Sequence, residues 1–367
     1  MSISRAQRPD YILLVAAGIL VIVGIFMIAS VSPSISNDRF GEPYYFLKNQ
    51  LVGVVVGCVA LLICWRIKYT FWKKTAPFLL ILSLFLMALV FVPGIGLELK
   101  GAARWIHFDS VTVQPAEITK LVFIIYLAAW LETKRKEVGN FTTGFLPFLV
   151  MLGIISIFFI LQPDIGTLGV LVLASTLLFF LGGGRIAQLG VLLVVGVAVL
   201  VLLVMTQPYR LDRVTVFLKP QTDLQGIGYQ LHQSLLAIGS GGFWGKGFGM
   251  SRQKFSYLPE PVGDSIFAVF GEEFGFVGSI GLVGLFLVFM WRGMRIARHA
   301  PDLFGTYLAT GIILLITLQA FTNIAAVSGL LPLTGLPLSF ISFGSSALVI
   351  NFAEVGILMN ISKYITQ

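Results

Sequence analysis

Long apolar stretches alternate with short polar ones along almost the whole chain. A membrane-crossing helix needs about 20 consecutive, mostly apolar residues, and ten windows of the sequence have this character. Because a bilayer offers backbone groups no partners, such windows are expected to be helical. The pattern predicts an all-α, polytopic membrane protein with about ten transmembrane helices. The windows are Tyr11–Val31, Tyr45–Trp65, Thr75–Val92, Pro115–Leu131, Thr143–Leu161, Ile165–Leu181, Ile186–Met205, Ser265–Trp291, Phe304–Leu330 and Phe340–Ile361.

The composition removes the other broad classes. Of 367 residues, 57% are hydrophobic and 11% are charged, whereas an average soluble domain carries roughly 25% charged residues. The two cysteines, Cys58 and Cys64, lie about 9 Å apart along one predicted helix, which is too far for a disulfide. We expect a single integral membrane domain over residues 1–367. Its first window reads as an anchor, because a cleaved signal peptide has a shorter apolar core.

The basic residues predict the orientation in the membrane. The net charge is +8, but the positive residues sit in loops between apolar windows, where such residues keep to the cytoplasmic side. We therefore expect no nucleic-acid partner. With the N-terminus inside, fourteen of the 25 Lys and Arg residues lie in cytoplasmic loops and four in short outer loops. Both termini are then cytoplasmic, and residues 206–263 form a large extracytoplasmic loop between spans 7 and 8.

The acidic residues gather on the outer side of the predicted membrane. Ionisable groups at such depth are costly and often functional. ATP is absent outside the cytoplasm, so a synthetic site facing outwards must use a substrate that arrives activated, such as a lipid-linked sugar diphosphate. An extracytoplasmic enzyme and a transporter both fit. On the outer side or just within it lie Glu98, Asp109, Glu117, Asp164, Asp212, Asp223, Glu260 and Asp264, whereas the cytoplasmic loops offer only Asp10, Glu132, Glu137 and Asp302 as clear cases.

Two outer segments before the large loop carry candidate substrate-binding residues. In GAARWIH, Arg104 stands beside a tryptophan and suits a diphosphate at headgroup depth, because guanidinium forks onto phosphate oxygens. Glu117 and Lys120 are three residues apart and share a helix face, where they can neutralise each other. This pair is either structural or part of the pocket. In QPDIGT, Asp164 either caps the next helix or contributes to the site.

Three further segments follow residue 206. AIGSGGFWGKGFG carries Lys246 among glycines that can bring N–H groups close to phosphate, but the spacing is not that of a P-loop. LPEPVGD places Glu260 four residues before Asp264. Asp264 is either an N-cap or a general base tuned by the neighbouring carboxylate. Leu331–Ser346, rich in Pro, Gly and Ser, re-enters the membrane and needs a cavity to do so.

Together these segments resemble the SEDS proteins of bacterial envelope growth over nearly the whole chain. The family patterns GARRW, QPSE, QPDxGT, GYQ…QS…AIGSGG…GKG, LPE…D…FAV…EE and TGxPLPFxSYGGSS have counterparts here in the same order. GEPYYFLKNQ and PGIG resemble the division branch more than the elongation branch. Arg104 and the carboxylates are retained, whereas the chain departs from the family patterns at Ala103, Ala116, Ser265, Ser339 and Phe343.

The resemblance implies a peptidoglycan glycosyltransferase that polymerises lipid II at the outer face of the bacterial cytoplasmic (inner) membrane, for septal wall synthesis. It places the catalytic aspartate at Asp264. A growing glycan on undecaprenyl diphosphate is the implied donor, and inversion at its α-linked sugar needs one carboxylate base. We expect Arg104, Lys246 and a divalent cation to neutralise the diphosphate. Arg210 and Arg213 are weaker candidates for the same role.

The cation, Mg²⁺ or Mn²⁺, is expected at Asp264 and Glu260, and no organic cofactor is expected. The resemblance also implies a class B penicillin-binding protein, a transpeptidase, as partner. Other membrane proteins of the divisome and membrane lipids complete the expected partners.

Other functions remain open. A lipid II flippase would also use many spans with intramembrane charges. A transporter should carry polar groups through both leaflets, however, and here they lie mostly on one side. A non-catalytic scaffold for a transpeptidase explains the spans but not the outer carboxylates. An elongation-type polymerase is a further alternative.

Overall fold

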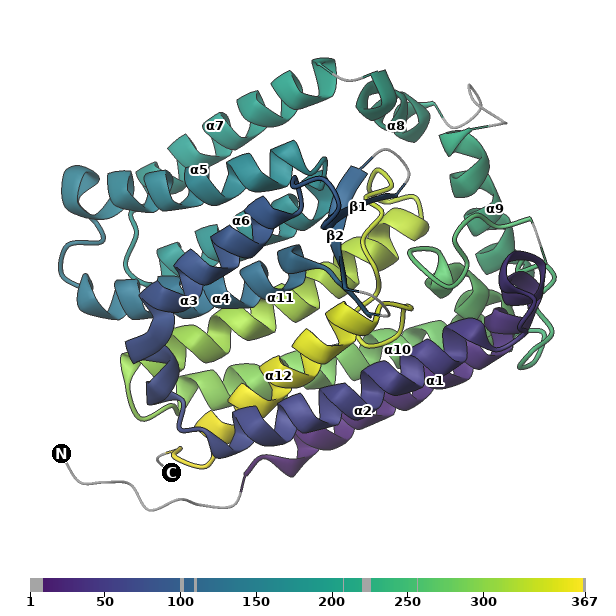
Figure 1. Ribbon diagram of the computed structural model, residues 1–367, viewed down its shortest axis with the longest axis horizontal. Coiled ribbons are helices and arrows are strands. Elements are labelled where there is room, and N and C mark those ends of the chain that lie inside the picture. The colour runs from purple at the N-terminus through teal and green to yellow at the C-terminus, as the bar shows by residue number, and fades with distance from the viewer. Residues whose placement is uncertain are drawn as a thin grey trace.

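The computed structural model describes residues 9–99, 102–108, 111–206, 208–219, 226–255 and 257–365. Most of its helices run along the long axis of the molecule, and the large loop lies at one end (Figure 1). The α-helices are α1 (Tyr11–Phe40), α2 (Tyr45–Arg66), α3 (Thr70–Leu89), α4 (Pro115–Thr133), α5 (Leu146–Leu161), α6 (Ile165–Leu181), α7 (Ile186–Met205), α8 (Pro208–Leu218), α9 (Ile227–Ser240), α10 (Ile266–Arg298), α11 (Leu303–Val327) and α12 (Ser345–Ser362). A π-helical turn, η1 (Phe141–Phe145), leads into α5.

The apolar windows correspond to helices, and the chain is a multi-pass helical membrane protein. Among the described residues, eight helices are long and apolar enough to cross a membrane, and α6 is a shorter apolar helix. The windows Ile165–Leu181 and Ile186–Met205 coincide with α6 and α7. α4 carries a charged pair in its interior, which lowers its apolar character. The count of ten spans therefore stays a prediction.

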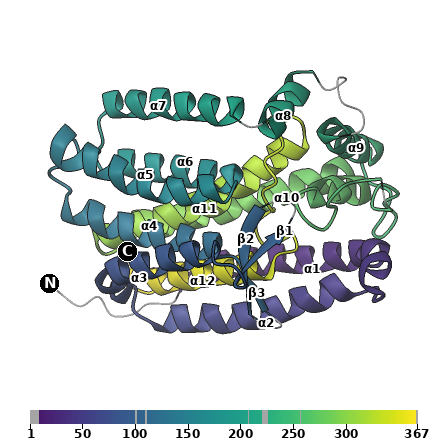
Figure 2. The same ribbon diagram turned by 45° about the horizontal axis from the view of Figure 1, so that its top comes forward.

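A small sheet is the main addition to the predicted all-helical fold. Strands β1 (Gly96–Leu99), β2 (Ala102–Phe108) and β3 (Val111–Val113) pair antiparallel in the order β1-β2-β3. The sheet lies between α3 and α4 in the chain and beside the large-loop end of the bundle (Figure 2). Strands of three to seven residues are too short to leave a clear alternating pattern, which explains why the sequence predicts no sheet.

The centre of the bundle is formed by α4, α11 and α12. In α11 and α12, 67% of the most apolar window is buried inside the protein, whereas in α7 the figure is 11%. α7 lies at the edge of the bundle in Figure 2, and most of its apolar side chains are exposed. Exposed apolar side chains on a spanning helix are suited to contact with lipid.

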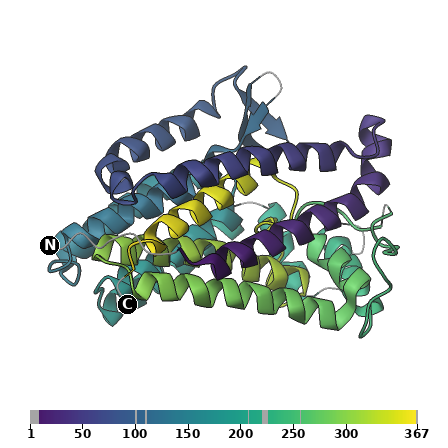
Figure 3. The same cartoon turned by 90° about the horizontal axis from the view of Figure 1, so that it is seen from below.

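Hydrogen bonds tie the helices together at the end opposite the large loop. Arg292 of α10 forms an ion pair with Asp10 over 2.6 Å, and Asp10 caps α1. Tyr69 donates its hydroxyl to Asp302 over 2.7 Å and its backbone N–H to Asn360 over 2.8 Å. Figure 3 shows the end of α12 on this side, with the large loop at the far end. Polar links at this end thus join α1 to α10, and α3 to α11 and α12.

Candidate active site

Asp264 lies in the tight turn that leads into α10, at the large-loop end of the bundle. The backbone oxygen of Glu260 accepts hydrogen bonds from the N–H groups of Gly263 (3.0 Å) and Ser265 (3.3 Å). Asn323 of α11 donates to the backbone oxygen of Asp264 over 2.7 Å. The turn and α11 together fix the position of the Asp264 backbone.

The two oxygens of the Asp264 carboxyl group have different surroundings. Gln230 of α9 donates an amide hydrogen bond to Oδ2 over 3.2 Å, and the same nitrogen lies 3.1 Å from the Ser265 hydroxyl. Oδ1 is buried and has no hydrogen-bond partner within the described part of the chain. A buried polar atom of this kind is costly unless something supplies a partner. One oxygen is therefore held, and the other is left for a proton, a cation or a substrate group.

The surroundings of Asp264 bring its pKa towards neutrality. Burial raises the pKa from its ordinary value of 3.8 to about 6. The hydrogen bond from Gln230 lowers this pKa, the negative charge of Glu260 raises it, and the positive charge of Arg213 lowers it. A carboxylate with a pKa in this range can accept a proton and release it again near neutral pH.

Arg213 reaches this carboxyl from α8, inside the large loop. Its Nη1 donates to the backbone oxygen of Leu333 over 2.8 Å. Gly335 lies between the two charged groups: a Cβ there would lie 3.8 Å from Arg213 Nη2 and 3.9 Å from Asp264 Oδ2. Gly335 also has a φ of +70°, which favours glycine. The guanidinium and the carboxyl group thus border the same small space.

The segment between α11 and α12 joins the Asp264 turn to the QPDIGT turn. Ser342 donates its hydroxyl to the backbone oxygen of Gly263 over 2.7 Å. On its other side, a Cβ at Gly166 would lie only 2.7 Å from the backbone oxygen of Thr334. A side chain at position 166 is therefore excluded, and the two turns lie on either side of one Pro/Gly-rich segment.

Arg104 and Asp164 both stabilise the QPDIGT turn. Arg104 donates from Nε to the backbone oxygen of Gln162 over 3.0 Å, and from Nη2 to that of Pro163. Asp164 is the N-cap of α6, and its carboxylate accepts from the N–H of Thr167 at 3.4 Å. Of the two interpretations of Asp164, the cap is the one with a contact in the structure. A substrate-binding role for either residue remains a prediction.

Glu117 and Lys120 form a buried ion pair beneath the same segment. Their charged atoms are 2.9 Å apart, and the side chains are 4% and 5% exposed. Lys120 also donates to Gln319 over 2.6 Å, and Gln319 donates to the backbone oxygen of Pro337 over 3.1 Å. The Gln319 amide therefore connects the ion pair to the segment between α11 and α12. The direct contact between Glu117 and Lys120 is the one that their predicted mutual neutralisation requires.

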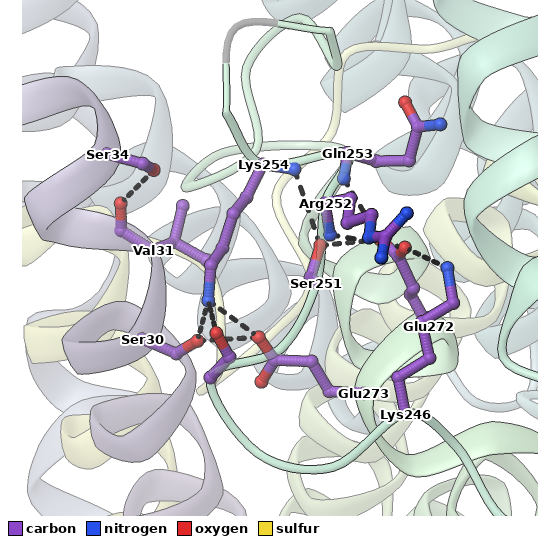
Figure 4. Close-up of polar contacts among 11 residues, drawn as sticks. Ser30, Val31, Ser34, Lys246, Ser251, Arg252, Gln253, Lys254, Glu272 and Glu273 are labelled. Carbon is purple, nitrogen blue, oxygen red and sulfur yellow. Dashed lines mark hydrogen bonds and ion pairs between the residues drawn. The ribbon is translucent and has the colours of Figure 1, made fainter.

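Lys246 belongs to a second cluster of polar side chains, which also contains Ser240, Ser251 and Glu272. Its Nζ lies 2.6 Å from Glu272 Oε1 and 2.9 Å from the Ser240 hydroxyl. Figure 4 shows it on the Glu272 side of that cluster. Its ammonium group contacts Glu272 and not Asp264, and its role in neutralising the diphosphate remains a prediction. Arg210 lies in α8 one turn before Arg213, but its side chain is outside the described residues, as are Asp109 and Asp223.

Three amide side chains of this region were not among the predicted site residues. Gln230 contacts the Asp264 carboxyl group, Asn323 bridges the backbone oxygens of Asp264 and Leu336, and Gln319 links Lys120 to Pro337. Gln319 and Asn323 are four residues apart on an apolar helix, so they share one face. That spacing is a signal that the sequence does contain.

Comparisons with known proteins identify the family of the chain. A family model described as cell cycle protein, covering FtsW, RodA and SpoVE, matches residues 10–367. Stage V sporulation protein E of Bacillus subtilis is 40% identical over 98% of this chain and 99% of its own. A protein of Trichlorobacter lovleyi named "Probable peptidoglycan glycosyltransferase FtsW" is 42% identical over 98% of this chain and 94% of its own.

Solved structures show the same fold. A chain from a peptidoglycan synthase complex that coordinates polymerization and crosslinking aligns with a TM-score of 0.76 and 27% identity, covering 96% of this chain and 97% of that one. The rod shape determining protein RodA of Thermus thermophilus aligns with a TM-score of 0.70 and 25% identity, covering 98% of both chains. The extent of these matches and the family model lead to one conclusion: this chain belongs to the FtsW/RodA/SpoVE family of cell cycle proteins.

Proposed function

We propose that this chain is a peptidoglycan glycosyltransferase, which polymerises lipid II into glycan strands at the outer face of the cytoplasmic membrane for septal wall synthesis. The observation that carries the proposal is the Asp264 carboxyl group, with one oxygen held by Gln230 and the other buried and unpartnered. The names of the FtsW relatives support the reaction class. Their identities of 39–42% also support a division role over an elongation role.

In the proposed reaction, Asp264 is the general base. Its carboxylate accepts the proton of the acceptor 4-hydroxyl group as that oxygen bonds to the donor sugar and the bond to undecaprenyl diphosphate breaks. Attack from the face opposite the diphosphate inverts the α-linked donor to a β-linked product. Diphosphate is a good leaving group, so neutralising its charge replaces protonation. We assign this task to Arg213, and its position beside Asp264 supports the assignment.

A divalent cation fits the residues present. The buried Asp264 Oδ1 has no hydrogen-bond partner in the described part of the chain, and the charge of Glu260 acts on the same carboxyl group. Among the described residues, no group of three or more His, Cys, Asp or Glu side chains is arranged to hold a metal. Mg²⁺ commonly uses one or two carboxylates together with substrate phosphates. Such a cation, held by Asp264 and Glu260, would supply positive charge to the diphosphate.

A flippase is the second candidate, and it requires a polar path through both leaflets. The contacts among the described residues favour the enzyme. The polar side chains at the end opposite the large loop form contacts between helices and do not line a path; they are Asp10, Tyr69, Arg292 and Asn360.

We also propose a class B penicillin-binding protein as partner, supported by the similarity to a chain of a peptidoglycan synthase complex.

The test is glycan synthesis by the purified protein in liposomes, supplied with lipid II and Mg²⁺ or Mn²⁺, with and without the partner transpeptidase. We expect polymer from the native chain and a loss of at least about a hundredfold for Asp264→Asn, since general bases contribute roughly 10²–10⁴-fold. Asp302→Asn, in the N-cap position of α11 at the end opposite the large loop, is the matched control and should retain most activity. Lipid II crossing sealed vesicles without polymer would instead support the flippase.

A further inference from the structure

The helical conformation of α10 is interrupted nine residues after its start, and backbone groups of the large loop supply hydrogen-bond partners at this interruption. Gly275 has φ 66° and ψ −162°, which is outside the helical region. Such a break leaves backbone groups without partners inside the helix. The N–H groups of Lys246 and Gly247 bond the oxygens of Glu272 and Glu273, each over 3.0 Å. The backbone of the loop thus takes the place of the missing helical turn.

Two further backbone hydrogen bonds are donated by α10 to the loop. The N–H groups of Phe276 and Val277 donate to the backbone oxygens of Gly242 (2.9 Å) and Phe243 (3.2 Å). A Cβ at Gly275 would lie 2.3 Å from the nitrogen of the loop residue Gly245. Four backbone hydrogen bonds and one glycine contact therefore fasten the loop onto α10.

The side chain of Glu272 accepts hydrogen bonds from several polar groups of this loop. The carboxylate is fully buried and ion-paired with Lys246 over 2.6 Å. It also accepts hydrogen bonds from the hydroxyls of Ser251 (2.5 Å) and Ser240 (3.3 Å), and from the N–H groups of Arg252 and Gln253 (both 3.2 Å). Figure 4 shows Lys246, Ser251, Arg252 and Gln253 converging on this carboxylate. Lys246, Ser251 and the two backbone N–H groups already satisfy this buried carboxylate. The Ser240 hydroxyl, whose single hydrogen can also reach the backbone oxygen of Ala237 at 3.0 Å, is a further donor.

The neighbouring Glu273 faces another element. It bonds Lys254 over 2.9 Å and the Ser30 hydroxyl of α1 over 2.7 Å, and Lys254 also donates to Ser30 over 2.8 Å. Figure 4 shows Lys254 between α1 and Glu273. Glu273 thus links the loop to α1, whereas Glu272 links it to the C-terminal end of α9.

The end of α9 matters because its beginning touches Asp264. Ser240, the last residue of α9, bonds Glu272, and ten residues earlier Gln230 bonds Asp264. Ten residues of helix span about 15 Å, so α9 is a short rod that is held at both ends against the first part of α10. Ile238 also lies close to Gly271 of α10.

We propose that Glu272 is a positioning residue, which holds the C-terminal end of α9 through Ser240 and Lys246 and thereby keeps the Gln230 amide against Asp264. This inference rests on the proposed function, in which Asp264 is the base. It predicts that Glu272 acts on the reaction through Gln230, at a distance and without touching substrate.

The test is a double-mutant cycle in the liposome assay, because residues that act as one unit have non-additive effects. We expect Glu272→Gln to lower kcat about tenfold with the KM for lipid II changed less than about twofold. In a Gln230→Ala background, the same change should lower kcat by less than about twofold. Effects that multiply, or a Gln230→Ala variant with native kcat, would overturn the proposal.

Hydrogen exchange of residues 227–240 is the second measurement, and it requires no turnover. Glu272→Gln should speed exchange in α9 and leave α11 unchanged, and unchanged exchange in α9 would overturn the proposal. The matched control is Glu137→Gln, which removes the same charge from a partly exposed ion pair with Lys134. If Glu272→Gln cannot be purified, Lys246→Met removes one donor and should act in the same direction. A native chain that makes no glycan would refute the proposed function, while α9 exchange would still test the positioning.

Discussion

The pH dependence of glycan synthesis tests the assignment of Asp264 most directly. The base works in its ionised form, and this form is lost as the pH falls through the pKa. With a pKa of about 6, roughly 90% of Asp264 is ionised at pH 7 and roughly 10% at pH 5. With its ordinary value of 3.8, more than about 90% would remain ionised at pH 5. The rate should therefore fall about ninefold between pH 7 and pH 5.

Two substitutions of neighbouring charges should move this profile in opposite directions. Glu260→Gln removes a negative charge that raises the pKa of Asp264, so the acid limb should move to lower pH. Arg213→Gln removes a positive charge that lowers the pKa, so the limb should move to higher pH. Shifts of about one pH unit are expected for charges this close. Initial rates are to be measured at fixed lipid II over a series of Mg²⁺ concentrations, because a cation bound by Asp264 itself lowers the pKa and moves the limb to lower pH. A limb that stays below pH 5 at the lowest Mg²⁺ concentration that supports turnover, or shifts in the same direction for the two variants, would refute the reasoning.

Three further predictions concern stability in detergent. Lys120→Met should destabilise the protein by about 3–5 kcal/mol, because it leaves Glu117 buried without its cation; the double variant with Glu117→Leu should recover most of this loss in thermal unfolding. Gly275→Ala should lower the unfolding temperature and speed proteolysis of the large loop, since a Cβ meets backbone at 2.3 Å; native protease resistance would contradict this. Asp164→Ala should cost about 1 kcal/mol, the usual worth of an N-cap, as measured by thermal unfolding with Asp164→Asn for comparison.

The sequence predicts the spanning helices well because a single quantity, apolar length, decides them. α6 and α7 begin and end at the predicted residues. The large loop is different: α8 and α9 have 11 and 14 residues and are amphipathic. Their formation depends on packing, of α9 against α10 and of α8 against α7 and α9. Short strands such as β3 have the same dependence. Local pattern cannot supply what tertiary contacts decide.

The candidate site was predicted in part. Asp264, Glu260 and Arg213 lie together, although they are distributed over a turn and α8. Lys246 lies in a conspicuous glycine-rich motif, yet its charge is used by Glu272. The sequence cannot reveal this, because partner choice depends on how the loop folds back on α10. Gln230 belongs to the GYQ motif that matches the family pattern, but its contact with Asp264 could not be predicted, since it depends on how α9 packs beside the Asp264 turn.

The break in α10 has a consequence for how the protein is assembled. By hydropathy, residues 266–298 behave as one continuous span, and they leave the ribosome only after the whole large loop. Until that loop has folded back, the backbone groups around Gly275 lack the partners that the loop supplies. Unsatisfied backbone in a bilayer costs several kcal/mol per group. The final shape of α10 therefore forms late in biogenesis, after the loop has folded, and a loop that fails to fold back would leave the Asp264 turn without its framework even in a fully inserted chain.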